Sequence, residues 1–421
     1  MNFYVRRYGR YSRNARNREK SVGRLSLFWR VAIVAYFIAC TAILGARWFF
    51  TSNLDAYRDD IASVVSRLTG VHIAIEDIHG GFRLIHPVLV LKNVSLARPN
   101  GPVSLTLPKI EAELSWSSLW HLEPRFRTLI VSEPNLTVRR LKNGSFDVAG
   151  FVLGHSSAVE RQNDESNRTE SSPAEQPFTK WLLAQDRLAI RDGAFTFIDE
   201  QKAEPVPVVI RNTQAVFEQG ILGWRAGASG AVIERRFSSA TAFDERHFEV
   251  KADIARSLFA HADNPLTWRG SLYAHFDSID IAKMLNNLGI KDYVHSGEGA
   301  ARFWASIDSG RLKNVTADLA LRRTSVTLGK HLEPLKLTKL HGRLLFSEKE
   351  DRQLSAQALS LEFEDAKGAK FGPADLSADC SRDAAGRILS CRFGASEITI
   401  GTLLRLSPAL PLPAEGREFL A

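Results

Sequence analysis

The sequence lacks the short motifs that mark most enzyme active sites and cofactor sites. It contains no G-x-S-x-G elbow, no P-loop, no dinucleotide-binding fingerprint, no H-E-x-x-H pair and no C-x-x-C pair. His72, His79 and His86 recur every seven residues, but this spacing across predicted strand and turn does not bring three imidazoles to one ion, so we interpret them as surface residues. We expect no catalytic residue, no metal site, no cofactor and no enzymatic activity.

Outside its N-terminus, the chain also lacks net charge. Residues 1–30 hold eight arginines and one lysine against one glutamate, which equals the +8 of the whole chain, so the other residues sum to zero. A body without net positive charge has no overall attraction for a phosphate backbone. This distribution excludes nucleic acid as a partner.

Cysteine is scarce, with only three in 421 residues. Cys40 lies in an apolar segment near the N-terminus, whereas Cys380 and Cys391 flank a predicted hairpin whose turn at 384–387 sets them directly opposite each other. Facing Cα atoms in an antiparallel pair lie about 4.5–5.5 Å apart, which is within the range for a disulfide. A disulfide in an oxidising compartment and a pair of small buried hydrophobic side chains are both compatible with this pattern.

One hydrophobic run is long enough to cross a bilayer. Val31–Ala46 contains no charge over sixteen residues, and with its apolar flanks it reaches the roughly 20 helical residues that a bilayer core of about 30 Å requires. Arg30 and Arg47 can extend to the headgroups, and Trp48 stands where an aromatic belt is expected. We predict a transmembrane helix over residues 27–50.

The arginine-rich tail predicts the orientation of that helix. The positive-inside rule places residues 1–26 in the cytoplasm and residues 51–421 on the far side of the membrane. A cleaved signal peptide is the alternative, but the run is long and Leu44–Ala46 is a poor cleavage site. We expect an uncleaved single-pass anchor.

Beyond the membrane helix, the hydrophobic pattern predicts a mainly β protein. Apolar and polar residues alternate along most segments, for example from Ala301 to Ile307. This pattern indicates an antiparallel sheet with one apolar face and one solvent-exposed face. We expect one β region at 51–154, a disordered linker or loop at 155–178, and a second β region at 179–421.

Three short helices are expected among the strands. Residues 54–68 carry apolar side chains at helical spacing and predict an amphipathic helix before the first strand. Further short helices are predicted at Phe178–Gln185 and Ile279–Leu288.

Several segments in a fixed order resemble the AsmA-like envelope proteins, most closely the YhdP subgroup. After the lone anchor come LTGVHIAIEDIHGGF (68–82), HPVLVLKNVSL (86–96) and the long stretch 107–151 beginning LPKIEAELSW. A later segment, LAIRDGAFTFIDE (188–200), is similar to the second part of the family pattern. The subgroup's members are usually longer, and the sequence ends in SPALPLPAEGREFLA without a terminal strand, so the chain resembles the N-terminal part of a longer member or a short member.

The resemblance implies a β-groove in the periplasm, anchored in the bacterial inner membrane. Its implied role is phospholipid transport between the inner and outer membranes and maintenance of the outer-membrane barrier, with membrane phospholipids and other envelope proteins as partners. The expected fold is an elongated antiparallel sheet curved into an apolar groove. Our candidates for its inward-facing residues are Phe195, Phe197, Val250, Phe276, Phe303, Leu319 and Phe363.

Two questions stay open at the level of sequence. The same alternation describes an open groove that holds acyl chains and a closed core in which the apolar residues pack on each other. A non-catalytic envelope scaffold that binds other proteins through its sheet edges is the alternative function.

Overall fold

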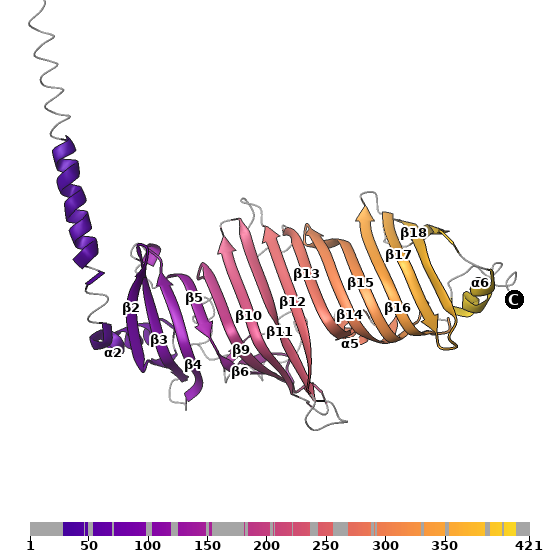
Figure 1. Cartoon of the computed structure of the whole chain (residues 1–421), viewed down its shortest axis with the longest axis horizontal. Coiled ribbons are helices and arrows are strands. Elements are labelled where there is room, and N and C mark those ends of the chain that lie inside the picture. The colour runs from indigo at the N-terminus through magenta and orange to yellow at the C-terminus, as the bar shows by residue number, and fades with distance from the viewer. Residues whose placement is uncertain are drawn as a thin grey trace, which may run out of the picture.

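The computed structural model describes residues 28–409, apart from 46, 49–53, 70, 98–102, 119–124, 149–150, 154–180, 182–183, 203–204, 206, 221, 236–242, 256–267, 288–289, 291–292, 330–331, 350–352, 384–387 and 398–399 (Figure 1). The predicted cytoplasmic tail and the predicted linker at 155–178 lie outside the described residues. Most of the predicted helix Phe178–Gln185 also lies outside them.

The described chain begins with the helix Phe28–Gly45, which is long and apolar enough to cross a membrane. Its large apolar side chains, such as Tyr36 and Leu44, are exposed in the structure. A helix that is apolar all round requires an apolar environment. Arg30 lies in its first turn, and Arg47 and Trp48 are also helical, so these flanking residues stand at the two ends of the apolar segment.

The body is one sheet of nineteen strands with a few short helices. The helices are η1 (Leu54–Tyr57), α2 (Arg58–Thr69), α5 (Ile281–Asn287), α6 (Ile400–Leu406) and η4 (Ser407–Ala409). The strands are β1 (His72–Ala74), β2 (Asp77–Arg83), β3 (His86–Ala97), β4 (Val103–Leu114), β5 (Phe126–Ser132), β6 (Asn135–Arg140), β7 (Phe146–Val148), β8 (Phe151–Leu153), β9 (Arg187–Asp199), β10 (Val208–Gly220), β11 (Gly223–Arg235), β12 (Phe243–Ala255), β13 (Arg269–Asp280), β14 (Val294–Asp308), β15 (Arg311–Val326), β16 (Leu335–Lys349), β17 (Gln353–Asp365), β18 (Lys370–Arg382) and β19 (Ile388–Ala395).

Neighbouring strands follow the chain order and are antiparallel, with two exceptions among the described strands: β1 pairs with β3, and one junction is parallel. β2 to β5 pair in turn, and β9 to β19 pair in turn, whereas β5 and β6 both pair with β9 in parallel. Leu129 lies beside Leu188 and Leu136 beside Phe195 at this junction. Parallel neighbours require a long crossover, and the chain between β6 and β9 supplies one. The predicted elongated antiparallel sheet is confirmed, and this junction joins the two predicted β regions into one sheet.

The pairing register aligns the apolar sides of the strands into two rows. The first row has one residue on each of fifteen strands: Ile78, Leu91, Ile110, Val131, Ile190, Ala215, Ala228, Val250, Ala274, Phe303, Ala317, Leu344, Ala358, Leu376 and Ala395. The second row begins one strand later: Leu89, Ala112, Leu129, Leu188, Phe217, Ala226, Ala252, Leu272, Ala305, Val315, Phe346, Ala356, Ala378 and Phe393. Members of the two rows on one strand are two residues apart, so both rows lie on the same face of the sheet. We call it the apolar face.

Backbone bulges bend several strands just beside the first row. Asp192, Asn212 and Ser360 lie at register shifts and have left-handed φ values of 53°, 53° and 48°, a conformation that asparagine and aspartate tolerate better than most residues. Each lies two or three residues from the first-row member of its strand. Because a bulge bends and twists its strand, bulges at corresponding positions curl the sheet.

Neighbouring strands hold these bulges in place. The Gln214 side-chain amide donates a hydrogen bond of 2.6 Å to the Asp192 carboxylate, and the Ser360 backbone N–H donates one of 2.8 Å to Asp375. These hydrogen bonds between neighbouring strands therefore stabilise the curvature of the sheet.

Two clusters of buried side chains lie on the apolar face, each under a helix. The first packs η1 and α2 against β2–β5, with Leu54, Ala62 and Ile78 buried among its members. The second packs α5 against β14 and β15, with Ile281 and Leu321 buried. The predicted helices at 54–68 and 279–288 thus correspond to η1 with α2 and to α5, and both cover the apolar face.

Candidate functional site

The apolar face is continuous along most of the sheet. Fifteen strands spaced by about 4.8 Å extend the first row over about 65 Å. No charged or polar side chain interrupts either row in the described strands. A surface of this kind attracts apolar groups along its whole length.

Helices cover this face only in part. The described helices pack mainly on β1, β2, β13 and β14, and none of them packs as extensively on β9–β12. The rows over β10–β13 consist mainly of small side chains, which are half-buried: Ala215, Ala226, Ala228, Ala252 and Ala274. Further along, Leu344 and Phe346 are each 39% exposed and Phe393 on β19 is exposed. Away from α2 and α5, the apolar face is therefore open or lined by small residues.

All seven residues predicted to face the groove lie on the apolar face. Val250 and Phe303 are members of the first row. Phe276 and Leu319 lie two residues from it, and Phe276 pairs with Phe248 and Ala301 and Leu319 with Ala301 and Gly342. Phe195, Phe197 and Phe363 lie beyond the register shifts of their strands, where they pair with Ile210, with Val208, and with Leu340 and Phe371. Their contact with a ligand stays a prediction.

The seven residues differ in accessibility. Leu319 is only 9% exposed in the cluster under α5, and Phe303 packs against the same cluster. Phe363 stacks on Phe371, with ring centroids 4.6 Å apart. Because Leu319 and Phe303 support a core, a charge at either position would disturb packing as well as any ligand site.

The alanines of the two rows were not among our sequence-based candidates. Our candidates were mainly large aromatic side chains, whereas Ala226, Ala228 and Ala252 leave more space above the sheet than a large side chain would. The alternation in GWRAGASGAVIER (223–235) already contains the signal, because its apolar positions are occupied mainly by small residues.

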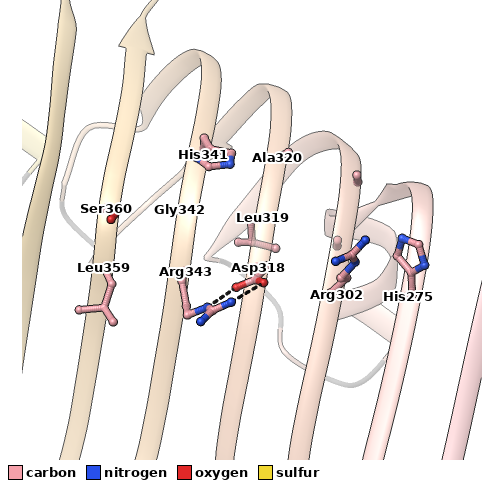
Figure 2. A pocket seen from close by; sticks show the side chains of 12 residues that line it. His275, Arg302, Asp318, Leu319, Ala320, His341, Gly342, Arg343, Leu359 and Ser360 are labelled. Atoms are coloured by element: carbon pink, nitrogen blue, oxygen red, sulfur yellow. Dashed lines mark hydrogen bonds and ion pairs between the residues drawn. The ribbon is translucent and has the colours of Figure 1, made fainter.

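The opposite face of the sheet is polar and carries ion pairs. Figure 2 shows Arg343 on β16 directed toward Asp318 on β15, with the Nη2–Oδ2 distance at 2.9 Å. The hydrogen bond from Arg343 lowers the pKa of the Asp318 carboxyl below its ordinary value of 3.8, and the charges of Arg302 and His341 act in the same direction. Similar cross-strand pairs, such as Lys92 with Asp77 at 2.9 Å, recur along this face. We call it the polar face.

A hollow of about 540 Å³ on the polar face is lined by the residues of Figure 2, including His275, Arg302 and His341. Its central ion pair is satisfied internally, and Arg302 and His341 are exposed to water. No group of three or more histidine, cysteine, aspartate or glutamate residues able to hold a metal occurs in the described part of the chain. His72 and His79 are exposed and His86 is half-buried.

Cys380 and Cys391 lie opposite each other in the β18–β19 ladder and form a disulfide in the structure. Their Cα atoms are 4.1 Å apart, and Cys391 is exposed. The exposure of Cys391 argues against the alternative of two small buried hydrophobic residues.

We predict that this disulfide is formed in the cell. The native protein, denatured and alkylated without reductant, should carry one alkyl group, at Cys40, whereas the chain that is reduced first should carry three. A Cys391→Ser variant should lose about 2–3 kcal/mol of stability, because the bridge closes a loop with a separation of 11 residues. Three alkylated thiols in the native protein would contradict the prediction.

The fold and the apolar face define a class of protein: a long β-sheet body with one apolar face, following a helix that can cross a membrane. The family model described as YhdP protein matches residues 20–421. The chain therefore belongs to the YhdP family, as its sequence segments predicted. No curated protein matches the chain.

Proposed function

We propose that this protein is anchored in the bacterial inner membrane, extends into the periplasm, and contributes to phospholipid transport between the inner and outer membranes and to the outer-membrane barrier. The observation that carries the proposal is the pair of unbroken apolar rows, which run across fifteen and fourteen strands and continue for about 65 Å. Membership of the YhdP family supports the same role.

The proposed mechanism is passive. Each CH₂ group of an acyl chain that leaves hydrocarbon for water costs about 0.8 kcal/mol, so a chain of about sixteen carbons needs more than about 10 kcal/mol of replacement contacts. A path between membranes must supply these contacts without interruption. The apolar face meets this requirement because every strand from β9 to β19 contributes an apolar residue to each row. The lipid headgroup would remain in water at the rim.

The orientation follows from charge. The arginine-rich tail stays on the cytoplasmic side by the positive-inside rule, which places the sheet in the periplasm. A periplasmic body is also consistent with the disulfide between Cys380 and Cys391, because that compartment is oxidising.

The alternative function is an envelope scaffold that binds other proteins. One observation favours it: among the described strands, β19 pairs with β18 alone, and its side chains Leu389 and Phe393 are exposed. An edge strand of this kind can pair with an extended segment of a partner.

A photo-crosslinking amino acid at single positions of the full-length chain in native cells tests the proposal. We expect phospholipid adducts, identified by mass spectrometry, from Ala252 and Ala378 on the apolar face. Ser271 and Ser377, which lie next to Leu272 and Ala378 in sequence but on the opposite, polar face, serve as matched controls and should give none. Protein adducts without lipid at Ala252 and Ala378 would favour the scaffold, and no adducts at either would indicate a closed core.

A further inference from the structure

The polar face carries an aromatic pair. Trp304 on β14 is 37% exposed and lies opposite Tyr273 on β13, and their ring centroids are 5.8 Å apart. Both side chains point away from the apolar face, because their neighbours in sequence belong to the two apolar rows. Tryptophan and tyrosine bury a large, rigid surface when a ligand covers them. The pair is therefore a place where a ligand can stack.

Hydrogen-bonding side chains flank the aromatic pair on the same face. Two residues away along each strand in one direction lie Ser271 and Ser306. Two residues away in the other direction lie His275 and Arg302. Each of these side chains is about 7 Å along the strand from the nearer ring. The rings are thus bordered by hydroxyl groups on one side and by nitrogen donors on the other.

The charge of Arg302 is available for a ligand. Asp318, which lies opposite Arg302 on β15, is bound by Arg343, with the Nη2–Oδ2 distance at 2.9 Å (Figure 2). Arg302 itself is exposed, and its side chain forms no hydrogen bond or ion pair with the described residues. It lines the hollow of about 540 Å³ together with small residues such as Ala300 and Ala320. A carboxylate can enter this hollow and pair with the guanidinium.

We infer that this part of the polar face binds the glycan strand of the bacterial cell wall. A sugar ring stacks on Trp304, because the C–H groups on the face of a pyranose carry partial positive charge and the face of an aromatic ring is negative. The hydroxyl and N-acetyl groups of the sugar bond to Ser271 and Ser306, and a carboxylate of the attached peptide pairs with Arg302. The inference rests on the periplasmic location of the proposed function, since the wall lies between the two membranes.

The size and the charge of this patch favour a glycan over a protein. A stable protein interface buries about 800 Å² on each partner around an apolar centre, whereas here polar side chains begin at the next position on each side of the two rings. A sugar has the same layout, with an apolar ring face and a polar rim. The 5.8 Å between the ring centroids is also close to the length of one sugar unit. Lys251 Nζ lies 5.9 Å from the centroid of the Tyr273 ring, so Trp304 has the freer ring.

Cosedimentation of the full-length chain, in non-ionic detergent, with purified peptidoglycan sacculi tests the inference. We expect the chain to sediment with the sacculi, and Trp304→Ala to lower the affinity by about fivefold or more. Trp116, which is 45% exposed and follows β4, is outside the patch, so Trp116→Ala is the matched control and should leave the affinity unchanged. Arg302→Gln should also weaken binding, and added salt should affect this variant less than the unsubstituted chain. Because Arg302 is exposed, its replacement should not change the Tm.

An uncharged oligomer of N-acetylglucosamine separates stacking from charge. Trp304→Ala should weaken the binding of this oligomer, whereas Arg302→Gln should not, because the oligomer has no carboxylate. No sedimentation of the unsubstituted chain, or equal sedimentation of all the variants, would overturn the inference. So would a protein that co-purifies through Trp304 without any binding to sacculi. Lipid adducts at Ala252, on the opposite face, should be unchanged in Trp304→Ala, so failure of this inference is distinguishable from failure of lipid transport.

Discussion

Replacing Ala356 with glutamate will abolish phospholipid contact with Ala378, the residue that faces it on β18, while leaving contact with Ala252 in place. Ala356 belongs to the second row, between Phe346 and Ala378, and is itself exposed. A glutamate there needs no repacking, but it places a carboxylate on the path of an acyl chain. A charge in hydrocarbon costs about 3 kcal/mol on insertion scales, which corresponds to a reduction in occupancy of about 100-fold.

The measurement is the yield of lipid adducts from photo-crosslinkers at Ala378 and Ala252. Ala252 lies on β12, nearer to the membrane helix along the sheet, so lipid entering from that end still reaches it. Gln357→Glu is the matched control: it introduces the same charge one residue away, on the polar face, where Gln357 pairs with the uncharged Leu345 and Ser377. Equal losses in the two variants would mean that charge or misfolding, and not the apolar face, explains the effect.

Replacing Gly299 with alanine will destabilise the sheet by about 3 kcal/mol or more. Gly299 on β14 pairs with Leu321 on β15, and its φ is +157°. A Cβ atom at this position would lie 2.1 Å from the Ala320 carbonyl oxygen, a backbone atom of β15 that cannot move without shifting the ladder. The close approach of these two strands lies beside the cluster under α5, so separating them also loosens that core.

Thermal unfolding of the full-length chain in detergent measures this effect as a fall in Tm. Gly81→Ala on β2 is the control, because a Cβ there meets no atom within 4 Å, and its effect should stay within about 0.5 kcal/mol. If the two variants unfold at the same temperature, the spacing between β14 and β15 in solution is wider than in this structure.

Much of the fold could be predicted because its signals are local. The charge-free run from Val31 to Ala46 predicted the membrane helix, and the period-two alternation predicted strands with one apolar side. The hairpin between Cys380 and Cys391 was predictable because a short turn determines which residues face each other. The helix that became α5 was predicted within two residues at its start.

The composition of the candidate site was predictable only in part. Phe303 and Leu319 lie on the apolar face, but their cover by α5 depends on how a helix packs across β14 and β15. The open stretch with Ala226, Ala228 and Ala252 was missed because alanine gives a weak hydrophobic signal in any single strand. The stretch of small residues becomes recognisable only when the strand pairing is known, because that pairing places several alanines side by side.

The sequence alone determined that the chain has a helix apolar enough to cross a membrane and strands with one apolar side, because both follow from the order of residues within a single helix or a single strand. Only the tertiary structure decided that these apolar sides form one face from Ile78 to Ala395. Bulges such as those at Asp192 and Asn212 shift the register within a strand, and the parallel pairing of β5 and β6 with β9 joins segments that lie far apart in the chain. A shift of one residue exchanges the two faces of a strand, so the continuity of the face depends on pairings between strands, which the pattern within each strand does not contain.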